Sequence, residues 1–92
     1  MKVKELFQDE KKWTQGTYAK TRNGNKTNVR HPNAACFCLL GGIAFCYPDI
    51  KKQQEVINIV AIKLNCTSIA AWNDNFDRTF EEVKSLVEEL DI

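Results

Sequence analysis

With 92 residues, of which 43% are hydrophobic and 27% charged, the chain has the balance of a folded protein and the length of one domain with a modest core. Its longest apolar run, residues 34–47, is shorter than the roughly 20 residues that cross a bilayer, so we expect no membrane span. The charged N-terminus lacks the apolar segment of a signal peptide, which predicts a cytoplasmic protein with four reduced cysteines.

The net charge of +1 conceals an uneven distribution along the chain. Residues 1–31 hold eight Lys/Arg and three Asp/Glu, whereas residues 32–92 hold five and nine. The basic residues within 13–31, a stretch without any acid, are Lys20, Arg22, Lys26 and Arg30. Such a local excess attracts an anionic partner, although a solvated hairpin would look the same. With 13 basic and 12 acidic residues overall, a nucleic-acid polymer is not the expected partner.

The first third of the chain predicts a short helix and then a β-hairpin. Apolar residues at Val3, Leu6 and Phe7 follow helical spacing, and this helix is expected to end near Lys12. Thr-rich segments 17–21 and 26–30 then flank an Asn-Gly pair, which favours a tight turn, so a hairpin is expected over residues 17–30.

Residues 34–47 predict a central helix that is apolar on all sides and therefore buried. Asn33 is the expected N-cap, and Pro48 ends the helix. The pair Gly41-Gly42 disfavours a helix by about 1 kcal/mol per residue relative to Ala. We therefore expect another helix or a ligand to approach closely at this pair.

The remaining chain predicts further helices. Asp49 can cap a helix over 50–65, and residues 69–72 favour a short helical turn. Thr79 and Glu82 fit a capping box for a last helix that ends near Leu90. The expected fold is a single α+β domain over residues 1–92, with about four helices around the apolar helix 34–47 and one N-terminal hairpin.

The cysteines do not predict a metal site. Cys36 and Cys38 are separated by one residue, and two residues that far apart on a helix point in nearly opposite directions. The cysteine spacing therefore predicts no metal. No cofactor is predicted either, because the sequence has no glycine-rich phosphate loop.

One alternative is a thiol enzyme. A cysteine near a helix N-terminus has a lowered pKa, and Cys38 with His31 and Asp74 would supply the parts of a catalytic triad. The competing interpretation of Cys38 is an inert, buried apolar side chain.

A second possibility is a non-enzymatic module that binds an anionic small molecule. The hairpin would supply positive charge, the expected helix start at Asn33 would donate N–H groups, and a second polar cluster would close the site. The expected ligand residues are Lys20, Arg22, Arg30, His31, Asn33, Asn73, Asp74 and Arg78. The second cluster could equally be a local turn, an ion pair and a helix cap.

A third possibility is a protein that acts through an interface, with a host protein or as a homodimer. The basic hairpin and the acidic last helix, which carries Glu81, Glu82, Glu88 and Glu89, would suit contacts between complementary surfaces.

Short motifs occur along the chain in Trp13–Gly16, Ala19 with Gly24, Phe37–Ile43, Ile69–Asp74, and Arg78-Thr79 with Val83. These segments resemble a family of small uncharacterised proteins from bacteria and their phages. The family shows the motifs W-x-x-G, A-x-x-x-x-G, W-C-x-L-G-A-L, W-N-D and R-T in this order. Phe37 stands where the family has Trp, and Gly42 where it has Ala. The resemblance implies an organisation and no activity; by analogy it suggests a phage accessory role, such as countering host defence by sequestering a signalling nucleotide.

Overall fold

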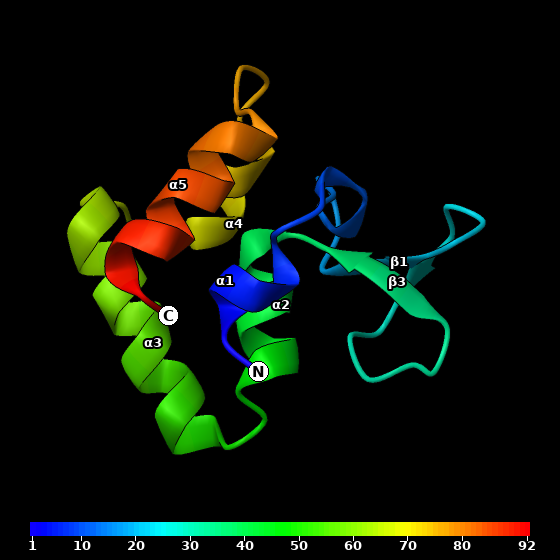
Figure 1. The fold of residues 1–92 in the computed structure, drawn as a ribbon, viewed down its shortest axis with the longest axis horizontal. Coiled ribbons are helices and arrows are strands. Elements are labelled where there is room, and N and C mark those ends of the chain that lie inside the picture. The colour runs from blue at the N-terminus through cyan, green and yellow to red at the C-terminus, as the bar shows by residue number, and fades with distance from the viewer.

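The computed structural model describes all 92 residues and has an α+β fold, as expected. Five α-helices, one short 3-10 helix and a three-stranded antiparallel sheet make up the chain, and the sheet extends to one side of the helices (Figure 1). None of the helices combines the length and the apolar character needed to cross a membrane.

The expected helix up to Lys12 is divided in two. Helix α1 spans Val3–Leu6, and the 3-10 helix η1 spans Glu10–Lys12. The Asp9 carboxylate accepts a hydrogen bond from the Lys11 N–H at 3.0 Å and caps η1. Because the Asp9 carboxylate accepts a hydrogen bond from a nearby backbone N–H, a new helical turn begins at Asp9 and α1 does not continue.

The sheet contains one more strand than the sequence predicted. Strands β1 (Ala19–Thr21) and β2 (Lys26–Thr27) pair antiparallel around a turn in which Gly24 has φ +86°. Strand β3 (Ala34–Phe37) pairs antiparallel with the other edge of β1, which gives the order β2-β1-β3. The two hairpin strands are shorter than the expected segments 17–21 and 26–30.

The prediction of one helix over residues 34–47 is therefore wrong. Residues 34–37 form β3, and helix α2 spans only Leu39–Cys46. Its N-cap is Cys38, whose Sγ accepts a hydrogen bond from the Gly41 N–H at 3.3 Å, whereas Asn33 lies before the strand. Residues 34–37 form a strand because the free edge of β1 supplies hydrogen-bond partners for their backbone N–H and carbonyl groups. A segment with a weak preference for helix becomes a strand where such partners are available. Helix α2 is also not buried on all sides, since Leu40 and Ala44 are partly exposed.

A close approach is found at both Gly41 and Gly42, but the neighbour at Gly41 is neither the helix nor the ligand that was expected. A Cβ at Gly41 would overlap the carbonyl oxygen of Tyr18, at the entrance to β1. A Cβ at Gly42 would lie 2.7 Å from Cζ of Phe7. The pair is thus required by the backbone that leads into the sheet and by the aromatic side chain that follows α1.

The three later helices agree with their sequence signals. Helices α3 (Ile50–Leu64), α4 (Ile69–Asp74) and α5 (Phe80–Leu90) are capped by Asp49, Ser68 and Thr79 respectively. Thr79 and Glu82 form the predicted capping box.

One core cluster of 15 buried residues unites these elements. Helix α2 packs against α1, α3 and α4 and lies on the side of the helical part that faces the sheet (Figure 1). The chain ends meet, because the Val3 N–H donates a hydrogen bond to the Ile92 carbonyl at 2.7 Å.

Candidate functional site

A polar cleft lies between η1, the hairpin turn and the residues that lead into β3. Its volume is about 620 Å³. Its lining residues are Lys12, Thr21, Arg22, Asn23, Asn25, Pro32, Asn33, Ala34 and Ala35. An adjoining hollow of about 530 Å³ shares Lys12, Thr21, Arg22 and Ala35 and adds Asp9, Lys11 and Cys36. We call the two hollows together the basic cleft.

The positive charges at the basic cleft are not neutralised by ion pairs. Six of the 13 basic residues form ion pairs, and these are Lys2, Lys4, Lys52, Lys63, Arg78 and Lys84. Lys11, Lys12 and Arg22 are not among them, and all three are exposed. Asp9 also lines the adjoining hollow, and its carboxylate accepts the Lys11 N–H instead of pairing with a cation. The charge is therefore available to an anion.

The structure brings only two of the sequence-predicted ligand residues into this cleft, Arg22 and Asn33. Lys20 lies nearby on β1, opposite Lys26 and Cys36, and does not line the cleft. His31 is exposed in the preceding turn, where its Nδ1 accepts the Asn33 N–H at 3.0 Å.

Arg30 is engaged elsewhere, at the C-terminal end of α2. Its guanidinium donates hydrogen bonds to the carbonyl oxygens of Ala44 and Phe45 and lies 5.6 Å from the centre of the Phe45 ring. A cation at this end of a helix satisfies free carbonyl groups and complements the helix dipole. Arg30 thus fixes the loop before β3 to α2.

Asn73 and Asp74 form hydrogen bonds with residues 13–16 and with Leu39. We call this group of residues the motif junction. Asn73 is fully buried. Its Oδ1 accepts the Trp13 indole N–H at 2.7 Å and the Leu39 N–H at 3.0 Å, and its Nδ2 donates to the Thr14 carbonyl at 3.1 Å. Asp74 accepts the Gly16 N–H at 3.0 Å. These contacts join α4, the start of α2 and residues 13–16, which is a structural role.

Arg78 also makes contacts within its own part of the fold. Its guanidinium stacks on the Trp72 ring at 3.8 Å, and its Nε donates to the Trp72 carbonyl at 2.9 Å. Its Nη1 pairs with Glu82 at 2.8 Å. Neither Arg78 nor the motif junction contributes to the lining of the basic cleft, so the predicted residues do not form one site.

The residues of the thiol hypothesis are separated. His31 precedes β3 and Cys38 follows it, so the two lie at opposite ends of a strand roughly 13 Å long. Cys38 and Asp74 both line a hollow of about 250 Å³, which His31 does not reach. Burial raises the pKa of the Cys38 thiol, and the N–H groups of Gly41 and Leu40 offset only part of this. A raised pKa leaves less of the nucleophilic thiolate. No group of His, Cys, Asp and Glu residues is arranged to hold a metal ion.

Among the polar residues of the basic cleft, sequence reasoning missed Lys11, Lys12, Asn23 and Asn25. The two asparagines were assigned only to the hairpin turn. Lys12 was expected at the end of a helix, and only the break at Asp9 places it beside the hairpin.

The fold and these contacts define a small α+β domain. Residues 2–90 match a family described as a family of unknown function, DUF6197, and the chain belongs to this family. No curated protein and no solved structure matches the chain.

Proposed function

We propose that this protein is a non-enzymatic binding module whose basic cleft takes an anionic small molecule, with a phosphorylated compound such as a nucleotide as the chemical class. The observation that carries the proposal is the placement of Lys11, Lys12 and Arg22, none of which has an ion-pair partner, around one concave polar surface. Its volume of about 620 Å³ falls within the range of small-molecule sites.

Neutral donors beside the cations support the same ligand class. Asn25 and Asn33 use their backbone N–H groups for hydrogen bonds within the protein, and both residues line the cleft. Arginine binds phosphate oxygens in a bidentate manner, and amide N–H groups add directional contacts. In a phage protein, such a site would sequester an anionic signalling nucleotide of the host.

Calorimetry with inorganic pyrophosphate, ADP and adenosine tests the proposal. We expect pyrophosphate and ADP to bind and adenosine to bind much more weakly, because only the first two carry negative charge. Affinity should fall as salt rises from about 0.05 to about 0.3 M. Equal affinity for ADP and adenosine, or no binding of either anion at millimolar concentration, would contradict it.

Matched charge variants locate the site. Arg22→Gln and Lys12→Gln should each weaken pyrophosphate binding by roughly tenfold, the worth of one charge-assisted contact. Lys51→Gln is the control, because Lys51 is an exposed lysine on α3 without an ion pair and away from the cleft lining. If Lys51→Gln weakens binding as much as Arg22→Gln, the effect comes from net charge and not from the basic cleft.

An interaction protein is the second candidate, favoured by apolar side chains on the outer surface of α3. Ile59 and Ile62 lie three residues apart on this helix and are 45% and 80% exposed. Sedimentation equilibrium tests for a homodimer, which Ile62→Lys should dissociate into folded monomers. A monomer at all concentrations would exclude the homodimer.

A further inference from the structure

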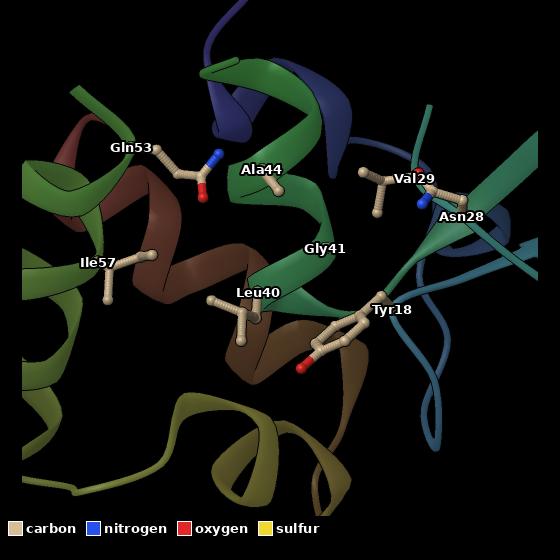
Figure 2. Close-up of a pocket in the computed structure, with 8 residues that line it drawn as sticks. All are labelled: Tyr18, Asn28, Val29, Leu40, Gly41, Ala44, Gln53 and Ile57. Carbon is tan, nitrogen blue, oxygen red and sulfur yellow. The ribbon is translucent and has the colours of Figure 1, made fainter. Parts of the chain in front are cut away.

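A separate pocket of about 310 Å³ lies over α2, between the sheet on one side and α3 on the other (Figure 2). Leu40, Gly41 and Ala44 of α2 form its floor. Figure 2 shows the other residues on the two flanks of this helix, with Tyr18, Asn28 and Val29 on the side of the sheet and Gln53 and Ile57 on the side of α3. The pocket shares no residue with the basic cleft.

No charged residue lines this pocket, in contrast to the basic cleft. Its walls are mostly apolar, with Val29, Leu40, Ala44 and Ile57 around the hollow. A charged group that entered would lose hydration without gaining an ionic partner, which is strongly unfavourable. The lining therefore favours an uncharged and largely apolar group.

Three neutral polar groups in the lining keep free hydrogen-bonding capacity. Gln53 uses its Nε2 to donate to the Tyr47 carbonyl at 3.0 Å, which leaves its Oε1 as an acceptor. Asn28 uses its Oδ1 to accept the Arg30 N–H at 2.8 Å, which leaves its Nδ2 as a donor. The Tyr18 hydroxyl can donate or accept a hydrogen bond. A matching ligand carries both a donor and an acceptor on its frame.

The aromatic ring of Tyr18 adds a preference for shape. It stands at the edge of the pocket beside Leu40 and Gly41, and it is 57% exposed (Figure 2). An aromatic wall favours a flat ring, which stacks on it or meets its edge. Gly41 has no side chain because the Tyr18 carbonyl occupies that space, so the same contact fixes the floor and the aromatic wall relative to each other.

We propose that this pocket binds a small, uncharged aromatic amide or nitrogen heterocycle. The proposal does not depend on the function of the basic cleft, because the two linings are separate. Benzamide is a suitable probe, since it combines a flat ring with a neutral donor and acceptor. Benzoate has nearly the same shape and carries a negative charge, so it is the matched control.

The test is a titration of the ¹⁵N-labelled protein followed by backbone amide chemical shifts. Benzamide should shift the amide signals of Gly41, Ala44 and Ile57 with a dissociation constant of roughly 1 mM, which is typical of a ligand of this size. Benzoate should bind at least about tenfold more weakly. The absence of shifts at these residues, or equal affinity for benzoate, would overturn the proposal.

Four substitutions complete the design. Ala44→Leu fills the hollow and should weaken benzamide binding at least about tenfold, whereas Ala71→Leu, on an exposed position of α4, should leave it unchanged. Tyr18→Ala removes a mostly exposed ring and should weaken binding several-fold without affecting the fold, so the test remains decisive if Ala44→Leu does not fold. Unchanged affinity in folded Ala44→Leu, or in Tyr18→Ala, would overturn the proposal. Arg22→Gln, which alters only the basic cleft, should not change benzamide binding.

Discussion

The indole N–H of Trp13 donates a hydrogen bond of 2.7 Å to the side-chain oxygen of Asn73, sixty residues away in the sequence. The same oxygen accepts the Leu39 N–H, at the first residue of α2. One buried amide thus joins the segment before the sheet, the start of α2 and the end of α4. Polar residues that look like a ligand site in the sequence here satisfy one another inside the protein.

Replacement of Asn73 should destabilise the fold severely. Asn73→Ala leaves the Trp13 and Leu39 N–H groups and the Thr14 carbonyl without their partner, at roughly 1–3 kcal/mol for each buried group that stays unsatisfied. Asn73→Asp should be at least as harmful, because it buries a charge that faces the Thr14 carbonyl. Urea unfolding measures the loss. Asn58→Ala is the control, since Asn58 is exposed on α3, and a similar loss there would contradict this account.

Gly41→Ala should lower the free energy of unfolding by roughly 1–3 kcal/mol. The helix propensity of Ala favours the substitution by about 1 kcal/mol, but the new Cβ overlaps the Tyr18 carbonyl, and backbone cannot move aside without disturbing β1. Gly42→Ala should cost less, because its Cβ meets the ring of Phe7, a side chain that can shift. Thermal unfolding of both variants checks the order, and a more stable Gly41→Ala would disprove the close approach.

The capping box of α5 should make stability depend on pH in the acid range. The Thr79 N–H and then the Arg78 guanidinium lower the pKa of Glu82 below its ordinary value of 4.5. Because the folded-state pKa is lower than the unfolded one, this contribution is present above the unfolded pKa and is lost as pH falls through the folded pKa. Glu82→Gln should therefore flatten the dependence of stability on pH below about 4.5. An identical pH profile in the variant would refute the assignment.

Cys46 in α2 and Cys38, the N-cap of this helix, should react slowly with iodoacetamide. Burial raises the pKa of Cys46 from 9.0 to about 11 and also raises that of Cys38, so little thiolate exists near pH 8. Mass spectrometry of the folded protein gives the rate at each site, with the protein in urea as the reference. Raising the pH should speed the reaction at Cys46. Rapid modification of Cys38 at neutral pH would instead favour thiol chemistry.

The raised pKa of Cys46 also has a defined effect on stability. The folded state favours the neutral thiol, so this contribution is complete below the unfolded pKa. It is lost as pH rises through the folded value of about 11. Cys46→Ser should therefore show a weaker fall in stability in alkali than the parent protein.

Signals that act within a few residues were predicted correctly from the sequence. Asp49 and the pair Thr79 and Glu82 begin α3 and α5, because a capping side chain bonds to N–H groups only two or three positions away. The sequence also indicated an uncharacterised family, and residues 2–90 match one.

The candidate site was predicted only in part. Arg22 and Asn33 line the basic cleft, whereas Arg30, Asn73 and Arg78 bond to backbone or buried groups elsewhere. A basic or amide side chain has the same appearance in a sequence whether it binds a ligand or a distant carbonyl. The choice depends on which partner the fold brings near.

The sequence by itself determined the N-caps of α3 and α5 and the hairpin turn at Gly24, since each follows from local backbone geometry. It indicated a close approach at Gly41-Gly42, but the neighbours that require it, the Tyr18 carbonyl and the Phe7 ring, come from the tertiary structure. Only the tertiary structure decided that residues 34–37 form a strand, that Asn73 is buried, and that the unpaired cations surround one cleft. Each of these depends on a partner from a distant part of the chain. The free edge of β1 supplies that partner for β3, and the packing of η1 beside the hairpin forms the cleft.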